Sequence, residues 1–408
     1  MSEHDRSDPE IYDVVVVGGG PSGATAALLL ADVGRSVLLI DRAGRIKPCG
    51  GAIPPRLIRD FSIPDHLIVA RITSARMISP ATRTVDMPID DGYVGMVDRE
   101  HFDPWLRKRA REKGAAYADG TFERIERDSS GAMTVHFTAK SDGESDAVAR
   151  SVRTRMLIGA DGALSRVARE ALPDVKKPSF VFAYHEIVKT PQDAAAHFAP
   201  ARCDVYYQGK VSPDFYGWVF PHGETASIGV GSANKGFSLR QSVAALRRDA
   251  ALEGTETIRC EGAPIPLKPM RRWDNGRDVL LAGDAAGVVA PASGEGIYYA
   301  MVGGQLAAEA VDLALRTGDA RALATARKRF MKAHGRVFWV LGLLQYFWYS
   351  SDRRRERFVS MCQDPDVQKL TWQAYMNKEL VRGKPGAHVR VFFKDVANLI
   401  SGWTPKPR

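Results

Sequence analysis

The stretch that decides the fold is Asp13-Val-Val-Val-Val-Gly18-Gly19-Gly20-Pro21-Ser22-Gly23-Ala24. Its four consecutive valines predict a strand that is buried on both faces. The glycines at 18, 20 and 23 have the Gly-x-Gly-x-x-Gly spacing of a turn that binds phosphate. Such a turn bends tightly at the first glycine, admits a pyrophosphate at the second and lets a helix pack closely at the third. Residues 25–33 continue as the expected helix, whose N-terminus faces the negative charge.

A second strand and an acid follow at the spacing of a dinucleotide-binding unit. Residues 36–40 are mainly apolar, and the run ends at Asp41. An acid at this place accepts hydrogen bonds from the hydroxyls of a ribose. A glycine turn with a purely structural role would need neither the second strand nor the acid. We therefore interpret this unit as a dinucleotide site.

Length, composition and cysteine content bound the class of protein. The 408 residues suffice for two domains, and a hydrophobic content of 45% is ordinary for a globular chain. Residues 1–10 are polar and acidic, unlike a secretory signal. The cysteines have no Cys-x-x-Cys pair, which predicts neither a zinc site nor a disulfide framework, and no other metal is expected; they are Cys49, Cys203, Cys260 and Cys362. We expect a cytoplasmic protein.

The positive charge is concentrated near the C-terminus. The net charge is +9, and residues 331–408 hold 14 Lys and Arg against 6 Asp and Glu. Within them, residues 337–349 form an apolar and aromatic run of 13 residues, whereas a membrane-spanning helix takes about 20. Two interpretations stay open: a core helix beside a solvated basic face, or contact of residues 337–357 with an anionic membrane surface. Nucleic acid explains the charge less well, because no binding motif accompanies it.

The order of patterns along the chain predicts interleaved domains. Residues 47–55 are rich in Gly and Pro and are expected to form a loop. Residues 71–97 and 171–265 predict strands. A charged helix is expected to begin after residue 97, and another helix is expected over 295–315. We expect an α/β protein in which a Rossmann-like nucleotide domain is interleaved with an antiparallel-sheet substrate domain and followed by a helical C-terminal region. The nucleotide domain is expected over 11–70, 98–170 and 268–330, and the substrate domain over 71–97 and 171–267. The C-terminal region is expected over 331–408.

Three motifs in a fixed order narrow the nucleotide. They are the glycine turn at 18–23, Gly-Ala-Asp-Gly-Ala-Leu-Ser-Arg-Val-Ala-Arg at 159–169 and Gly-Asp-Ala-Ala-Gly at 283–287. Together they resemble the flavoprotein superfamily of aromatic hydroxylases similar to p-hydroxybenzoate hydroxylase, which implies FAD. The resemblance places Asp41 at the adenosine ribose, Asp284 at the ribityl chain, and Asp161 with Gly162 beneath the flavin. For Asp161 and Asp284, helix N-capping is the alternative role, because each follows an expected strand.

A narrower resemblance rests on further stretches. Pro48-Cys-Gly-Gly-Ala-Ile-Pro54 is similar to a loop of the geranylgeranyl reductase family, and Tyr216-Gly-Trp-Val-Phe-Pro221 matches its Tyr-x-Trp-x-Phe-Pro element. The tail, especially residues 354–368, resembles the branch that acts in (bacterio)chlorophyll synthesis. The resemblance implies three successive reductions that convert a geranylgeranyl group, on the pigment or as its diphosphate, to phytyl. It also implies a peripheral place at a photosynthetic membrane.

The two resemblances together define the expected cofactor site. Its expected residues are Gly18, Gly20, Pro21, Ser22, Gly23, Asp41, Arg42, Cys49, Gly50, Gly51, Ala52, Arg99, Asp161, Gly162, Gly283, Asp284, Gly287, Gly294 and Gly296.

Cys49 is the candidate catalytic residue. An isolated alkene accepts hydride poorly, so a proton must arrive with the hydride that reduced flavin delivers. A cysteine beside glycine and proline can approach the flavin edge, and the acidity of a thiol is readily adjusted. The alternative is a buried small hydrophobe.

Aromatic residues are the candidates for substrate contact. Tyr216, Trp218 and Phe220 alternate along an expected strand, where they could wall a prenyl channel or form ordinary sheet core. Tyr298 and Tyr299 are secondary candidates near the expected flavin. Two histidines, at 185 and 222, are interpreted as structural.

Two other functions stay open. A monooxygenase of an apolar substrate would use the same FAD fold, and a non-catalytic carrier of a prenylated pigment would keep a vestigial flavin site. NADPH and reduced ferredoxin both stay open as electron donors, because no second glycine-rich unit indicates a nicotinamide site. No pattern in the sequence indicates an oligomeric state.

Overall fold

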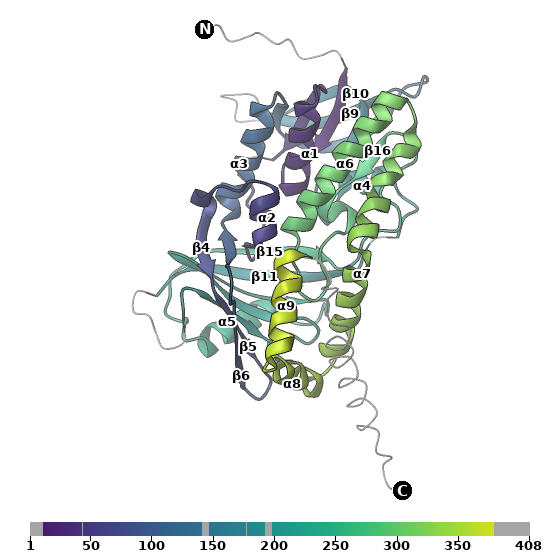
Figure 1. The fold of residues 1–408 in the computed structure, drawn as a ribbon. Helices are drawn as coiled ribbons and strands as arrows, with labels where there is room; N and C mark the ends of the chain where they lie inside the picture. The colour runs from purple at the N-terminus through teal and green to yellow at the C-terminus, as the bar shows by residue number, and fades with distance from the viewer. Residues whose placement is uncertain (1–10, 43, 141–146, 177, 192–197, 379–408) are drawn as a thin grey trace.

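The computed structural model describes residues 11–42, 44–140, 147–176, 178–191 and 198–378. Two large sheets and one small sheet organise the chain, and helices cover them (Figure 1). Residues 1–10 and the end of the expected C-terminal region, 379–408, lie outside the described residues.

The first sheet is built on the valine strand. Its parallel part has the order β8, β2, β1, β10, β16, and β9 joins the outer halves of β8 and β10 as an antiparallel strand. Val14, Val15 and Val16 are fully buried, as expected for a strand covered on both faces. The strands are β1 (Tyr12–Val17), β2 (Val37–Asp41), β8 (Ala116–Arg127), β9 (Met133–Lys140), β10 (Ala147–Gly159) and β16 (Val279–Leu281).

Helices from distant parts of the chain cover this sheet. α1 (Pro21–Asp32) continues from the glycine turn and packs against α3 (Arg99–Glu112) and α6 (Ile297–Thr317). A Cβ atom on Gly304 of α6 would lie 2.1 Å from the carbonyl oxygen of Ser22, so glycine lets the two helices approach closely. The short elements η2 (Gly283–Ala286) and α4 (Arg166–Ala171) complete this half of the molecule. The helices expected after residue 97 and over 295–315 are confirmed.

The second sheet has the order β15, β11, β14, β13, β12, β5, β6. Its neighbours are antiparallel except β5 and β12, so the sheet is mixed. α5 (Leu239–Asp249) packs against β11 and β14, although residues 171–265 were expected to be rich in strands. The strands are β5 (Ser74–Ile78), β6 (Thr84–Pro88), β11 (Phe180–Lys189), β12 (Arg202–Tyr206), β13 (Gly217–His222), β14 (Thr225–Ser232) and β15 (Thr257–Pro266).

A small third sheet anchors the cysteine-containing loop. Ala52 and Ile53 form β3 and pair with Met96 and Gly95. The expectation of a loop throughout 47–55 is therefore wrong at its end, because a distant strand supplies backbone hydrogen bonds that the local pattern does not reveal. The elements here are β3 (Ala52–Ile53), α2 (Pro55–Asp60), η1 (Asp65–Leu67), β4 (Ile68–Ile72) and β7 (Val94–Val97).

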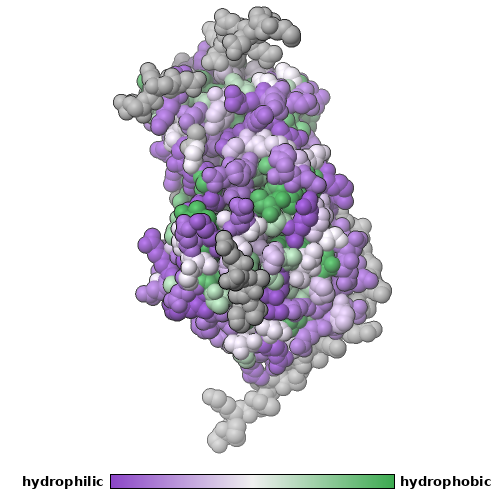
Figure 2. All heavy atoms as spheres, turned by 90° about the vertical axis from the view of Figure 1, so that its left-hand side faces the viewer, coloured by the Kyte–Doolittle hydropathy of each residue, from purple (hydrophilic) through white to green (hydrophobic). Residues whose placement is uncertain are grey.

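The C-terminal region is helical, as expected. It contains η3 (Ala320–Leu323), α7 (Ala324–Trp348), α8 (Asp352–Met361) and α9 (Pro365–Asn377), and α7 runs down one side of the molecule (Figure 1). In the part of the chain that the structure describes, no helix is both long and apolar enough to cross a membrane. The face drawn in Figure 2 is mainly hydrophilic, with small separate hydrophobic patches.

Candidate functional site

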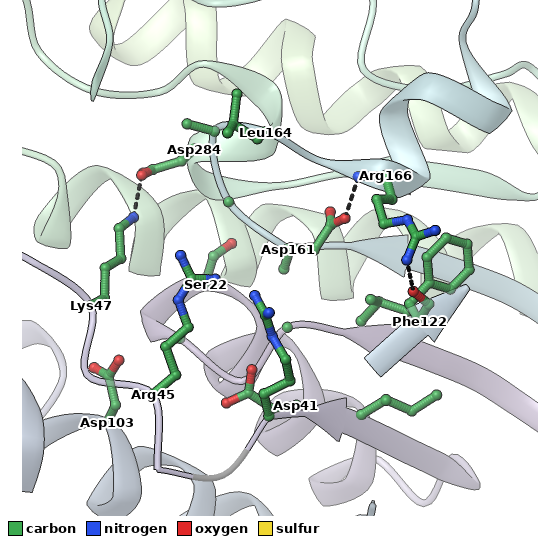
Figure 3. A pocket seen from close by; sticks show the side chains of 18 of the residues that line it. Ser22, Asp41, Arg45, Lys47, Asp103, Phe122, Asp161, Leu164, Arg166 and Asp284 are labelled. Atoms are coloured by element: carbon green, nitrogen blue, oxygen red, sulfur yellow. Dashed lines mark hydrogen bonds and ion pairs between the residues drawn. The ribbon is translucent and has the colours of Figure 1, made fainter. Parts of the chain in front are cut away.

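A cavity of about 470 Å³ lies where the carboxyl ends of β1, β2 and β10 meet (Figure 3). This edge of a parallel sheet is where ligands bind in such folds. The cavity brings together all three glycine motifs, although about 260 residues separate the first from the last. Its lining includes Gly18, Gly20, Pro21, Ser22, Asp41, Arg42, Arg99, Asp161, Gly162 and Asp284 from the expected cofactor set.

The glycine turn has a shape that other residues would not adopt. Gly18 has φ +102°, and a Cβ there would lie 2.3 Å from the carbonyl oxygen of Ala160. At Gly23 a Cβ would lie 1.8 Å from the carbonyl oxygen of Gly18. Gly20 instead borders the cavity, and the nearest atom to a Cβ there would be 3.8 Å away. The first and third glycines thus set the turn, and the second opens it to a ligand.

The start of α1 fits a phosphate. No side chain caps its N-terminus, and Ser22 Oγ is a buried polar atom with no hydrogen-bond partner among the described residues. A helix N-terminus with uncapped N–H groups attracts anions. The residues present therefore fit the pyrophosphate of FAD.

Asp41 ends β2 at the edge of the cavity. Its Oδ2 atom lies 3.0 Å from Nη1 of Arg107, a residue of α3 that the sequence did not single out. Burial raises the pKa of Asp41, although the N–H of Gly19 and the charge of Arg107 oppose the shift. The carboxylate is placed to accept a ribose hydroxyl while Arg107 holds it.

The two later acids differ in their partners. Asp161 borders the cavity, but its carboxylate accepts hydrogen bonds from Ser165 Oγ at 2.5 Å and from the N–H of Arg166 at 2.6 Å. It therefore stabilises the start of α4, which matches the capping alternative. Asp284 makes no capping bond to η2 and pairs instead with Lys47, which extends toward it (Figure 3). Asp284 thus lies within η2 without capping it and borders the cavity.

Cys49 does not line the cavity; its loop follows Lys47, which does, and lies against the second sheet. Gly51 has φ +73°, and a Cβ there would lie 2.5 Å from Cε1 of His222. At Gly50 a Cβ would lie 3.2 Å from Cδ2 of Phe220. The N–H of Gly51 donates to Cys49 Sγ at 3.4 Å. These contacts hold the thiol at the junction of the two large sheets.

Arg99 places a fixed charge beside Cys49. Its guanidinium is buried and donates to both carboxylate oxygens of Asp103, each at 2.6 Å. Burial alone would lower the pKa of Arg99, but Asp103 outweighs it, with a smaller contribution from Cys49, so the pKa lies above its ordinary value. Arg99 therefore stays a cation next to the thiol.

The expected aromatic residues form a continuous row. The ring centroids of Tyr216 and Trp218 are 6.0 Å apart, and those of Trp218 and Phe220 are 6.2 Å apart. Tyr216 donates to the carbonyl oxygen of Ser293 at 2.6 Å, which ties the row to the Gly294–Gly296 stretch. The row therefore runs from this stretch to the Cys49 loop, which Phe220 contacts.

Other expected residues shape the surroundings of the cavity or serve packing. Gly283 and Gly287 have positive φ and shape η2, and Ala52 lies in β3 behind the loop. Tyr298 and Tyr299 are buried in an aromatic cluster with Phe330 of α7, so they serve packing. The cavity also has a basic lining that the sequence reading missed; it consists of Arg45, Lys47, Arg107, Arg166 and Arg169.

Family comparisons agree with the fold and the cavity. Residues 63–334 match the family described as FAD binding domain, and residues 13–57 match the family described as FAD dependent oxidoreductase. The protein is thus a FAD-dependent oxidoreductase. Within the described residues, no group of three or more candidate ligands could hold a metal ion.

Relatives define the family within this class. The chain is 58% identical over 394 residues to a geranylgeranyl diphosphate reductase of Rhodobacter capsulatus, which covers 97% of this chain and 98% of the relative. It is 36% identical over 406 residues to a geranylgeranyl diphosphate reductase of Synechocystis, with coverage of 96% and 98%. The chain therefore belongs to the geranylgeranyl reductase family, as the cysteine loop and the aromatic strand predicted.

Solved structures share the architecture. A geranylgeranyl bacteriochlorophyll reductase-like protein of Thermoplasma acidophilum superposes with a TM-score of 0.77 at 21% identity, covering 91% of this chain and 98% of that one. A p-nitrophenol 4-monooxygenase of Pseudomonas putida gives 0.67 at 17% identity, with coverage of 90% and 97%. At these identities the likeness concerns the fold alone. The fold is therefore common to reductase-like and monooxygenase proteins.

Proposed function

We propose that this protein reduces the three isolated double bonds of a geranylgeranyl group to give phytyl, with the group carried on (bacterio)chlorophyll or as the diphosphate. The observation that carries the proposal is that the Cys49 loop contacts the aromatic row at Phe220 and adjoins the FAD cavity through Lys47 and Arg99, which border both the cavity and the space beside Cys49. The names of the relatives support the substrate class. A monooxygenase is less well supported, because the resemblance to monooxygenases is confined to the fold.

The protein's own residues supply binding and the proton. Bound reduced FAD supplies the hydride. The backbone at Gly18 and Gly20 would hold the pyrophosphate, and Asp41 would hold the ribose. Asp284 would accept from the ribityl hydroxyls in place of Lys47. Cys49 Sγ would give a proton to the second alkene carbon as the hydride reaches the first.

The aromatic row would form the wall of the prenyl site. Tyr216 and Trp218 are buried, and Phe220 is partly buried beside Gly50. Such a wall contacts an isoprenoid tail along its length and excludes water from the carbocation character that develops on protonation. NADPH or reduced ferredoxin would restore the reduced flavin.

Product mass tests the proposal. Anaerobic incubation with geranylgeranylated pigment or geranylgeranyl diphosphate and a reductant should give products that gain two, four and six hydrogen atoms. A product that gains one oxygen atom in air would favour the monooxygenase. An unchanged tail, with FAD bound and reduced, would contradict the proposal.

Cys49 is tested by substitution. Cys49→Ser and Cys49→Ala should retain FAD but lose alkene reduction by at least about a hundredfold, the usual scale for a lost general acid. The exposed Cys260 gives the control, and Cys260→Ser should react normally. A Cys49→Ala variant with unchanged rate would remove the role.

We also propose a peripheral contact of α7 with an anionic membrane. Trp339, Leu343 and Tyr346 share one helix face and are 69%, 48% and 82% exposed. Arg353 and Arg357 are exposed in α8, so cationic groups follow the apolar face within a few residues along the chain, as in interfacial segments. By contrast, other aromatic residues of the 337–349 run are buried, as the core interpretation expects, so the proposed contact concerns the exposed face alone. The buried residues are Phe338, Trp348 and Tyr349.

Vesicle flotation tests this contact. With phosphatidylcholine vesicles that contain phosphatidylglycerol, the wild-type protein should float at low salt and less at high salt. A Trp339→Ser/Tyr346→Ser variant should lose flotation, whereas Val148→Ser, at a similarly exposed apolar residue of β10, should not. Equal flotation of all three proteins would exclude α7 as the contact.

A further inference from the structure

A small polar crevice lies beside Cys49, and it shares Lys47 and Arg99 with the FAD cavity. Its volume is about 10 Å³, which suffices for about one water molecule. Cys49 lines one end, and charged residues of the second sheet and of the start of α3 line the rest. The full lining is Lys47, Cys49, Val97, Asp98, Arg99, His185, Ile187, His222, Thr225, Arg259 and Glu261.

His185 and Glu261 form a hydrogen-bonded pair in this crevice. His185 Nε2 lies 3.1 Å from Glu261 Oε2, and His185 Nδ1 lies 2.9 Å from Ser227 Oγ. Since a carboxylate only accepts, Nε2 donates and Nδ1 accepts from the serine hydroxyl. The side chain of His185 is 4% exposed and that of Glu261 is 15% exposed, so the carboxyl group is reached by solvent while the imidazole is not.

Charge fixes Glu261 from the other side. Arg259 Nε lies 2.9 Å from Glu261 Oε1, and the same guanidinium lies 3.1 Å from Asp98 Oδ1 and 3.1 Å from Glu100 Oε2. Both oxygens of Glu261 are thus oriented, one by His185 and one by Arg259. The carboxyl group is held between solvent and the crevice.

Ser227, which completes this series of hydrogen bonds, does not act as a nucleophile. Ser227 is fully buried, and its Oγ accepts from Trp218 Nε1 at 3.1 Å while its proton points to His185. A hydrolase would need an exposed hydroxyl at a substrate site. Instead, the Ser227 hydroxyl ties the pair to Trp218 of the aromatic row.

His222 has a different task. Its Nε2 atom donates to the carbonyl oxygen of Gly50 at 3.1 Å. Burial lowers its pKa to about 4, against smaller opposing effects that include Gly50 and Asp98. At neutral pH its ring is uncharged, and it holds the Cys49 loop through its single N–H without taking up a second proton.

We propose that Glu261 returns protons from solvent to Cys49 through this crevice, and that His185 and Arg259 position its carboxyl group. The inference rests on the proposed function, in which each double bond consumes one hydride from reduced FAD and one proton. The S–H bond of Cys49 breaks as a C–H bond forms on the alkene, which leaves a thiolate. A water in the crevice gives a proton to the thiolate and takes one from the Glu261 carboxyl group, which regains a proton from solvent. No electrons move in this return, and the external reductant restores the flavin.

Solvent isotope effects test the route. Steady-state turnover, with an external reductant in excess, is measured in H₂O and in D₂O across pH, because the first reduction uses the proton that Cys49 already holds and only later reductions need its return. Glu261→Gln keeps the shape but not the acid, so alkene reduction should slow by about ten- to a hundredfold and its solvent isotope effect should rise. Glu261→Asp should recover part of the rate. FAD affinity and the rate of flavin reduction should not change in either variant.

Two controls separate the route from its rivals. Glu256→Gln, at an exposed residue just before β15 that pairs with Lys189, should behave as wild type. Lys47→Gln tests the other proton carrier in the crevice. If Lys47→Gln raises the isotope effect and Glu261→Gln does not, Lys47 is the carrier and the proposal is wrong.

A readout without turnover completes the test. Alkylation of Cys49 by iodoacetamide, followed by mass spectrometry of its peptide, reports how readily the thiolate forms. Removal of a neighbouring negative charge favours the thiolate, so Glu261→Gln should shift this pH profile to lower pH and Glu256→Gln should not. If the wild-type protein reduces substrate and Glu261→Gln matches it in rate, solvent isotope effect and alkylation profile, the proton return through Glu261 is wrong but the proposed function stands. A wild-type protein that leaves the substrate unreduced would overturn the proposed function.

Discussion

At the scale of single residues, the site depends on side chains that take opposite roles although the sequence presents them alike. Asp161 and Asp284 both follow a strand and precede a glycine-rich turn. Only Asp284 faces the cavity without a capping bond, because α4 takes both oxygens of Asp161. The sequence could predict that two acids lie at this edge. It could not predict which carboxylate would be occupied by capping, because that depends on the first turn of the six-residue helix α4.

The Asp41 carboxylate gives the pH dependence of cofactor binding. Burial raises its pKa in the folded protein, so the folded state takes up the proton more readily than the unfolded chain. As the pH falls through this raised pKa, the stability of the FAD-free protein should gain from Asp41, whereas FAD affinity should fall because a ribose hydroxyl prefers the ionised acceptor. Fluorescence titrations with FAD over a series of falling pH values should show this weakening. Asp41→Asn should bind FAD more weakly at pH 8 and lose most of the pH dependence.

At the scale of elements, local patterns predicted those with a strong internal signal. The valine strand, the glycine turn and α1 were expected, and the structure places them as β1 and Pro21–Asp32. β3 was missed because two residues carry no period, and their partner strand lies about 40 residues away. α5 was missed although it had a signal: Ser238 caps its N-terminus, and Val243 and Leu246 face the sheet at helical spacing.

The contact between α1 and α6 gives a matched pair of substitutions. At Gly304 an added Cβ would lie 2.1 Å from backbone oxygen, so Gly304→Ala must separate the helices, and we expect a loss of about 1–3 kcal/mol. At the adjacent Gly303 the nearest atom would be 3.5 Å away, an ordinary contact. Gly303→Ala should therefore be neutral or stabilising, because alanine favours a helix by about 1 kcal/mol. Thermal unfolding of both variants measures the change in stability. Equal losses of stability would show that the close contact of α6 with α1 at Gly304 does not matter.

At the scale of the whole molecule, the C-terminal region is attached to the flavin half by a buried ion pair. Lys378 Nζ, just after α9, lies 2.8 Å from Glu295 Oε2, and the two side chains are 4% and 5% exposed. Glu295 also accepts from the N–H of Tyr298 at the start of α6. Burial lowers the pKa of Lys378, while Glu295 opposes the shift. No local pattern could predict this pair, because its members are 83 residues apart.

Removal of one partner should release α9. Lys378→Met leaves a buried carboxylate without its cation, and we expect a cost of about 3–5 kcal/mol at this contact. Limited proteolysis should then cut near α9 while the first sheet stays protected. Lys378→Met/Glu295→Gln removes both charges and should recover most of the protection. If the double variant is cut as fast as the single one, the ion pair is not what fixes α9.

The local motifs of the site could be predicted from the sequence, but the contacts between them could not. The glycine motifs, Asp41 and the Cys49 loop each carried a local signal. Arg107, Lys47 and the His185–Glu261 pair did not, because each meets its partner only when separate segments fold together. The same distinction explains why the two histidines were interpreted as structural: their neighbours come from strands far apart in the chain.

The first sheet has a consequence for how the protein is made. The glycine turn leaves the ribosome early, but β16, Asp284 and the α6 face that packs against α1 emerge only after residue 278. A nascent chain can therefore form the turn without being able to retain flavin. We therefore expect cofactor loading to be one of the last events of maturation, and a chain truncated before α6 to bind no FAD.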